Sequence, residues 1–133
     1  MIFLLDTNIC VVYLNQPQSR VAAQLHCFHP QDITVCSVVK AELFFGAMKS
    51  QRPDQTLQKQ QGFLAAFHSL PFDDKSALLF GKIRADLQRQ GQPIGPYDLQ
   101  IAAIAMANDL TLVTHNTREY SRIDGLRLAD WEV

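Results

Sequence analysis

Short apolar runs alternate along this chain with longer segments of helical character. The runs are Ile2–Leu5, Ile33–Cys36, Leu70–Phe72, Thr111–Thr114 and Leu126–Leu128. Short apolar runs bounded by turn-forming or capping residues are typical of buried strands. Strands that alternate with helices form a parallel sheet with helices on both faces. The pattern therefore predicts an α/β fold of three layers, α/β/α, around a parallel sheet of four to five strands.

The segments between these runs predict the helices. Thr7 or Asn8 caps a first helix that ends near Leu14, and Ser37 caps the helix Val38–Lys49. The other expected helices are Ser19–Phe28, Asp54–Ser69, a helix from its cap Asp73 to Gln90, and Asp98–Asn108. The last of these is apolar almost all round, which indicates a buried helix.

Length and charge limit the classes of function. With 133 residues, we expect one domain, residues 1–133. No apolar stretch is long enough to cross a membrane, and the N-terminus lacks the basic segment of a signal peptide, so we expect a cytoplasmic protein. The net charge of −1 excludes broad coating of nucleic acid. A nucleic-acid substrate would have to be held by a few placed cations, to which metal ions can add.

Acidic residues fall where this architecture brings segments together. Asp6 ends the first strand, Glu42 lies just over one turn into the helix after the second strand, and Asp98 opens the buried helix. Asn116 and Glu119 follow the fourth strand. Carboxylates gathered at one sheet edge repel one another unless a cation neutralises them. Their hard oxygen ligands suit Mg²⁺ or Mn²⁺, which can activate water for attack on a phosphodiester.

Each acid also has a structural interpretation. Asp6 can cap the first helix, and Asp98 is a first-turn acid that the helix dipole favours. Glu119 stands three residues after Asn116, which is the spacing of a capping box. Glu42 is harder to explain structurally, because Val38 and Phe45 share its helix face.

Basic and imidazole side chains near the proposed site are candidates for contact with the substrate. Arg118 and Arg122 are close enough in sequence to reach phosphates, and His115 lies beside the end of the fourth strand. For His115, a position in a surface loop is the alternative interpretation.

Four segments, in order, resemble the motifs of PIN domains. They are Leu4–Leu5–Asp6–Thr7–Asn8, then Val38 to Leu43 with Phe45–Gly46, then Pro93–Ile94 with Asp98 to Ala103, and finally Leu112–Val113–Thr114 with Asn116 to Tyr120. The ending, Gly125–Leu126–Arg127 through Asp130–Trp131, resembles the close of the VapC toxins of bacterial toxin–antitoxin pairs. The resemblance spans almost the whole chain.

This resemblance implies a PIN-like fold and an Mg²⁺- or Mn²⁺-dependent endoribonuclease. Its substrate would be RNA, it would form a homodimer, and a cognate VapB-type antitoxin would hold it inactive. Asp6 and Asp98 become metal ligands, and Glu42 joins them as the third acid. The resemblance also places supporting residues around the acids: Thr7, Asn8, Thr114, Asn116 and Arg118.

One departure and several alternatives accompany this resemblance. Many family members carry an aspartate in the fourth motif, where this chain has Asn116 and then Glu119. Glu119 is therefore our candidate for the fourth catalytic acid. A phospho-receiver domain, a catalytically inactive RNA- or protein-binding module of the same fold, and a structure-specific DNA nuclease are the competing interpretations.

Overall fold

One parallel sheet organises the computed structural model, which describes residues 1–133. Its strands lie in the order β3-β2-β1-β4-β5. They are β1 (Phe3–Leu5), β2 (Ile33–Cys36), β3 (His68–Leu70), β4 (Thr111–Val113) and β5 (Leu128–Ala129). This confirms the predicted α/β class and the parallel sheet.

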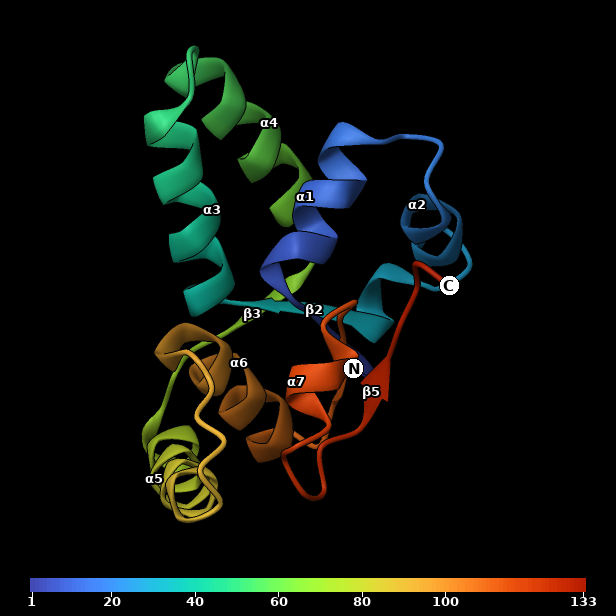
Figure 1. The fold of residues 1–133 in the computed structure, drawn as a ribbon. Helices are drawn as coiled ribbons and strands as arrows, with labels where there is room; N and C mark the ends of the chain where they lie inside the picture. Colours follow the sequence, from blue (N-terminus) through green and yellow to red (C-terminus); the bar gives the residue numbers. More distant parts are fainter.

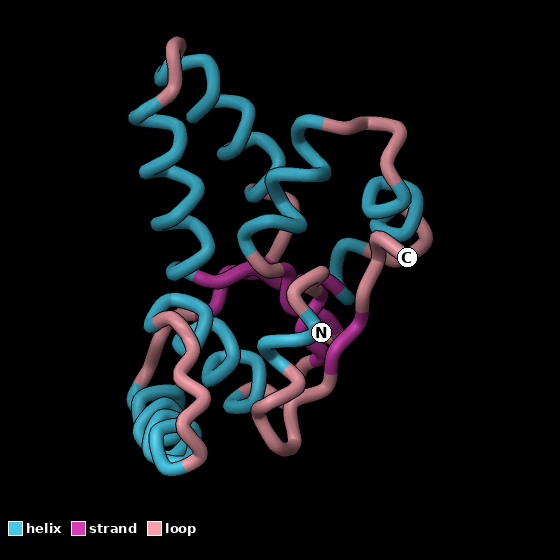
Figure 2. The backbone as a smooth tube through the Cα atoms, viewed as in Figure 1, coloured by secondary structure: helices cyan, strands magenta, loops and turns pink.

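Helices cover both faces of the sheet. They are α1 (Thr7–Asn15), α2 (Arg20–Leu25), α3 (Ser37–Lys49), α4 (Pro53–Leu64), α5 (Asp74–Arg89), α6 (Pro96–Ala107) and α7 (Thr117–Tyr120). Figure 1 shows α1, α3 and α4 on one side of the sheet and α5, α6 and α7 on the other. The strands lie between the two groups of helices in Figure 2. No helix is long and apolar enough to cross a lipid bilayer.

The strand order reverses between β1 and β4. From β1 the chain moves outward through β2 and β3, and then returns to the other side of β1 for β4 and β5. The two central strands pair with Leu5 opposite Val113. In open α/β sheets, sites form beside the carboxyl ends of strands at such a reversal. Asp6 and Thr114, which follow these strands, therefore lie at the expected place.

The core is continuous on both faces of the central strands. Leu4, Val35 and Leu112 are fully buried. Helix α6 is buried on nearly all sides, as its sequence predicts, because it packs between the sheet and α5. The first turn of α6, which carries Asp98, is thereby held against the sheet.

Several boundaries differ from those expected. The helix expected over Asp54–Ser69 ends at Leu64, and the third strand is His68–Leu70 rather than Leu70–Phe72. Pairing with β2 sets the bounds of the third strand, because Leu70 at its end lies opposite Cys36. Phe72 instead packs against Phe80.

The other corrections have similar causes. The second helix ends at Leu25 rather than Phe28, and its predicted cap, Ser19, accepts a hydrogen bond from the Ala22 amide. The fifth strand lies two residues later than predicted at its start, because Leu128 pairs with Leu112. Cys36 rather than Ser37 occupies the cap position of α3. Asp73 caps α5 as predicted.

Candidate active site

Asp6 occupies the junction between β1 and α1. Its amide donates to the carbonyl of Val113 on β4, so the residue is tied to both central strands. Its Oδ1 accepts from the Ile9 amide at 2.9 Å, which makes Asp6, and not Thr7 or Asn8, the cap of α1. The side chain is only 6% exposed. Burial raises the pKa of Asp6 to about 6, while the Thr114 hydroxyl and the Ile9 amide oppose that rise.

The capping role of Asp6 leaves its second carboxylate oxygen to be explained. A neutral serine or asparagine caps a helix as well as an aspartate does. Burying a carboxylate at this position costs free energy that such a residue would avoid. The structural interpretation of Asp6 is therefore correct but incomplete.

Glu42 is joined to the start of α1 by a short hydrogen bond. Thr7 Oγ1 donates to Glu42 Oε1 at 2.6 Å, between residues 35 positions apart in the chain. Thr7 follows Asp6 directly, so this bond brings the carboxylate of α3 to the carboxyl end of β1. The Glu42 side chain is partly buried.

Asp98 enters the same region from the first turn of α6. It is partly buried, and burial is the largest cause of the rise in its pKa. The negative charges of Glu119 and Glu42 raise it further. The charge of Asp98 in turn contributes to the raised pKa of Asp6. Asp98 is thus within electrostatic range of the other three acids expected from the sequence.

The segment after β4 supplies a chain of hydrogen bonds. The buried Thr114 accepts from the Asn116 amide at 3.0 Å through Oγ1. Asn116 Nδ2 then donates to Glu119 Oε2 at 3.1 Å. The expected capping box is not formed, because the Asn116 amide is already bound to Thr114 and α7 has no side-chain cap. Glu119 thus has no capping function.

None of the four carboxylates has a cationic partner. The salt bridges of the protein lie elsewhere, as in Arg89–Asp86 and Arg127–Asp109. Gathered acids without a basic partner leave a region that a divalent cation can neutralise.

The donor set suits a small hard cation. No three His, Cys, Asp or Glu side chains lie close enough together in this structure to hold a metal ion between them. Mg²⁺ typically binds through one or two carboxylates and keeps several of its waters. An open edge lined by carboxylates fits that mode of binding better than it would fit the four-ligand cage of structural zinc.

Two residues that the sequence predicted as supporting residues of the site make no contact with the four acids. Asn8 and Arg118 are exposed, and neither side chain forms a hydrogen bond or ion pair with the acids. The His115 side chain contacts the C-terminal segment, because its Nδ1 lies 3.0 Å from Asp130 Oδ2. Arg122 Nη1 reaches the carbonyl of Pro93.

Tertiary structure adds two residues that sequence reasoning missed. Tyr120 is 1% exposed, and the charges of Asp98 and Asp6 contribute to its raised pKa. Glu132 is near enough to raise the pKa of Asp6. Tyr120 directly follows Glu119 in the fourth motif, which was the only signal for it. Nothing in the sequence indicates that the C-terminal segment returns toward β1.

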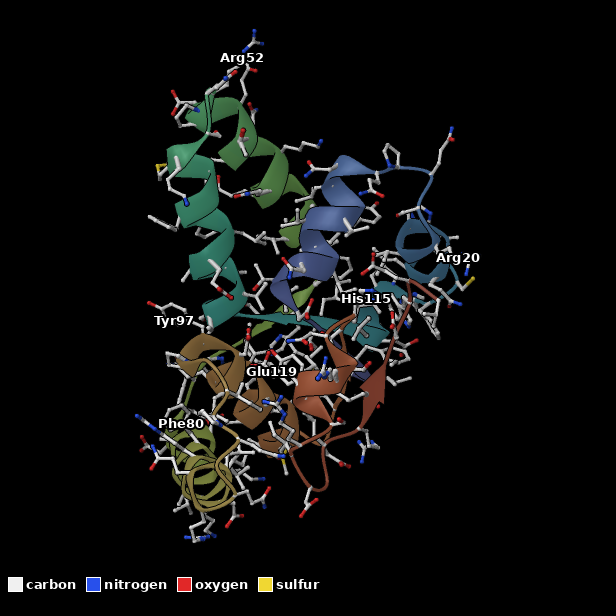
Figure 3. The ribbon with its side chains drawn as sticks, in the orientation of Figure 1. Arg20, Arg52, Phe80, Tyr97, His115 and Glu119 are labelled. Carbon is white, nitrogen blue, oxygen red and sulfur yellow. The ribbon has the colours of Figure 1, made fainter.

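Two depressions in the surface meet at Glu42. One of about 550 Å³ lies between α3 and the start of α6 and is lined by Ser37, Val38, Ala41, Glu42, Phe45, Tyr97 and Gln100. The other, of about 210 Å³, is bounded by α1, α3 and α4 and includes Thr7, Val11, Leu14 and Lys59. In Figure 3, Tyr97 lies near the start of α6, and Glu119, which belongs to α7, lies in the middle of the view.

Comparisons with known proteins agree with this geometry. The family profile of the PIN domain matches residues 3–126. The chain is 40% identical over 129 residues to the tRNA(fMet)-specific endonuclease VapC of Shigella flexneri, and the match covers 97% of each chain. It is 37% identical over 133 residues to ribonuclease VapC2 of Rickettsia felis, covering 99% of each.

Solved structures give the same assignment. A chain of DNA-bound VapBC from Salmonella typhimurium superposes with a TM-score of 0.93 at 36% identity, covering 98% of each chain. VapBC2 from Rickettsia felis, bound to a fragment of promoter DNA, superposes with a TM-score of 0.92, also at 36% identity, covering 98% of this chain and 99% of that one. The chain therefore belongs to the PIN-domain family and, within it, to the VapC ribonucleases.

Proposed function

We propose that this VapC ribonuclease hydrolyses RNA phosphodiesters with Asp6, Asp98 and Glu42 as the residues that hold a divalent cation. PIN-domain ribonucleases generally depend on divalent metal ions. The observation that carries the residue assignment is the gathering of carboxylates without basic partners at the ends of β1 and β4. We propose Mg²⁺ as the ion, with Mn²⁺ able to replace it, because oxygen ligands and an open site suit both.

The roles of the individual residues follow from their positions. A bound cation of this type lowers the pKa of a coordinated water and stabilises charge on the phosphate. Asp6 and Asp98 approach the site from two rigid elements, the end of β1 and the first turn of α6. Thr7 restrains Glu42 through its hydrogen bond. Asn116 orients Glu119, our candidate for the fourth catalytic acid, and Thr114 supports both Asp6 and the Asn116 amide.

For the substrate we propose tRNA. Two relatives at 36–40% identity are named tRNA(fMet)-specific endonucleases. The larger depression beside Glu42 offers room for nucleotides next to the acids. The exposed side chains of Asn8 and Arg118 are free to contact the RNA backbone. This proposal replaces the DNA-nuclease alternative, and the family assignment makes the phospho-receiver alternative wrong.

For the partner we propose a VapB-type antitoxin, since similar solved structures are VapBC complexes. The smaller depression reaches Glu42 and has an apolar side formed by Val11, Leu14 and Leu43. An arginine or lysine of the antitoxin could pair with the acids while an apolar segment fills that depression.

We also propose a homodimer, a single domain and a cytoplasmic location. A homodimer is supported by the exposed apolar side chains Phe45, Met48, Leu78 and Tyr97. A single domain over residues 1–133 is supported by one sheet that includes strands from both ends of the chain. The cytoplasm is the proposed location because it contains the tRNA substrate.

Cleavage assays with total RNA test the proposal directly. The protein is freed from its antitoxin and incubated with Mg²⁺ or Mn²⁺, with and without EDTA, and the RNA ends are mapped. We expect cleavage only with metal, with tRNA(fMet) cut before other tRNAs. Asp6→Asn, Glu42→Gln and Asp98→Asn should each lower the rate by ~10²–10⁴.

A surface acid provides the matched control. Asp86 on α5 pairs with Arg89 and is exposed, so Asp86→Asn should cleave at the wild-type rate. Activity that survives EDTA, or that survives Asp98→Asn, would contradict the metal assignment. Metal-dependent cleavage that spares every tRNA would contradict only the substrate assignment.

A further inference from the structure

The hydroxyl of Tyr120 is buried without a hydrogen-bond partner. Tyr120 ends α7 and is 1% exposed, and no protein atom satisfies Oη. Leaving a buried hydroxyl unpaired destabilises a folded protein. Apart from Gln60 Oε1, Tyr120 Oη is the only buried side-chain polar atom of the protein without a hydrogen-bond partner. The unpaired hydroxyl therefore needs an explanation.

Packing does not explain the hydroxyl. The ring of Tyr120 belongs to the hydrophobic core, and a phenylalanine would supply the same apolar ring without a polar atom. Tyrosine and tryptophan normally find a partner for their polar atom when buried. The oxygen of Tyr120 is therefore the part of the side chain that needs a role.

The surroundings of the hydroxyl point toward the acids. After burial, the charge of Asp98 is the largest influence on the pKa of Tyr120, followed by that of Asp6, and both raise it. The hydroxyl is close enough to the Asp98 carboxylate to lower its pKa through a hydrogen-bonding interaction, although the pair does not reach full hydrogen-bond geometry. Tyr120 adjoins Glu119 on α7, and α7 lies on the same side of the sheet as α6 in Figure 1. A phenol is protonated at neutral pH, so its hydroxyl can donate a hydrogen bond to a nearby carboxylate.

We propose that Tyr120 is a positioning residue, whose hydroxyl donates a hydrogen bond to the Asp98 carboxylate when a divalent cation occupies the site. The inference rests on the proposed role of Asp98 as a metal ligand. Partners that hydrogen-bond to a ligand fix its orientation, and their removal typically lowers metal affinity or activity by about 10–100-fold. The Tyr120 hydroxyl, held in the core beside Asp98, is then placed to fix the orientation of that carboxylate toward a cation.

Tyr120→Phe tests this assignment because it removes one oxygen and keeps the ring. Mn²⁺ affinity is measured by calorimetric titration of the full chain, without RNA, beside thermal unfolding in EDTA. We expect affinity for Mn²⁺ to fall by about 10–100-fold. The metal-free protein should be as stable as the wild type or more stable, because an unpaired polar atom has been removed. With Mn²⁺ and RNA, kcat should fall while KM for RNA stays within about twofold.

Tyr13→Phe is the matched control, since it also removes one hydroxyl from a tyrosine. Tyr13 lies on α1, and its hydroxyl is 3.4 Å from His26 Nε2. This variant should bind Mn²⁺ as the wild type does. Unchanged Mn²⁺ affinity in Tyr120→Phe would overturn the inference, as would a joint loss of affinity and of metal-free stability, which would indicate a structural role.

Asp98→Asn separates this inference from the proposed function. If Asp98→Asn abolishes Mn²⁺ binding and Tyr120→Phe leaves it unchanged, only the role of Tyr120 is wrong. If Asp98→Asn also binds Mn²⁺ normally, the metal assignment itself is wrong and the inference fails with it.

Discussion

Thr7 Oγ1 and Glu42 Oε1 lie 2.6 Å apart and join the first turn of α1 to α3. Thr7 directly follows Asp6, the most buried acid of the site, and its hydroxyl restrains a second acid, Glu42. The bond spans 35 positions of the sequence and both segments that follow the strands β1 and β2. The bond therefore holds the Glu42 carboxylate at a fixed position relative to Asp6, which precedes Thr7 in the chain.

Thr7→Val should therefore lower the rate of RNA cleavage by about tenfold or more, because Glu42 loses its only hydrogen-bond donor from α1. Valine has nearly the volume of threonine, so the fold should be kept. The measurement is kcat at saturating Mg²⁺. Thr7→Ser retains the hydroxyl and should keep most of the activity, and equal rates for the valine and serine variants would contradict the role of the bond.

Asp6→Asn should stabilise the metal-free protein at neutral pH while it lowers the rate of cleavage by ~10²–10⁴. The rise in pKa from the ordinary 3.8 to about 6 corresponds to roughly 3 kcal/mol of folding free energy. Because the folded-state pKa is raised, stability from the neutral carboxyl is complete below pH 3.8 and is lost as the pH rises through 6. Asparagine cannot ionise and can still accept from the Ile9 amide.

Urea unfolding in EDTA at several pH values measures this effect. The advantage of Asp6→Asn should be largest at pH 7–8 and should vanish well below pH 3.8, where the wild-type carboxyl is protonated in both the folded and the unfolded state. An advantage that does not change with pH would show that ionisation of Asp6 is not its cause.

Glu119→Gln should weaken Mn²⁺ binding and slow cleavage, because it removes a negative charge from the site. The variant keeps a side-chain acceptor for Asn116 Nδ2, so only the charge is lost. The pKa of Asp98 should fall at the same time, since Glu119 is the largest charge effect that raises it. Asn116→Ala is the comparison, because it removes the hydrogen bond and leaves the charge. If Glu119→Gln binds metal and cleaves as the wild type does, Glu119 is not the fourth acid.

Trp131→Ala should destabilise the fold by about 3–5 kcal/mol, the usual cost of truncating a buried tryptophan. Trp131 is 6% exposed and stacks on Phe28 with ring centroids 5.6 Å apart, while Phe3 of β1 meets its ring edge-on. Urea unfolding followed by circular dichroism measures the loss, since the variant has no tryptophan fluorescence. Trp131→Phe should lose distinctly less, and equal losses would contradict a stacking role.

Expression of the wild-type chain alone should arrest growth of its host, and co-expression with its antitoxin should restore growth. Asp98→Asn should be harmless alone, because it lacks the proposed metal ligand. It should still co-purify with the antitoxin, since the apolar contacts along Val11 and Leu14 persist. A wild-type chain that is harmless at high expression in a host lacking the antitoxin would contradict the toxin assignment.

Local sequence patterns were sufficient where one local interaction dominates. The strand Ile33–Cys36 and the buried character of α6 follow from runs of apolar residues, and Asp73 caps α5 through a contact three residues away. The boundary between α4 and β3 could not be predicted in this way. Ala65–Ser69 is compatible with a helix, and only pairing of Leu70 with Cys36 on a distant strand ends it earlier.

The sequence by itself determined the parallel α/β class and, through the motif resemblance, which acids to consider: Asp6, Glu42, Asp98 and Glu119. The tertiary structure alone decided how these side chains are held. Glu119 accepts a hydrogen bond from the side chain of Asn116 rather than from its backbone N–H, because that N–H already donates to Thr114 Oγ1. Tyr120 has an unpaired hydroxyl, because its ring is held in the core with the oxygen beside the acids. Burial and charge at a site depend on segments that are far apart in the chain, so they exist only once the sheet and both helix layers have assembled.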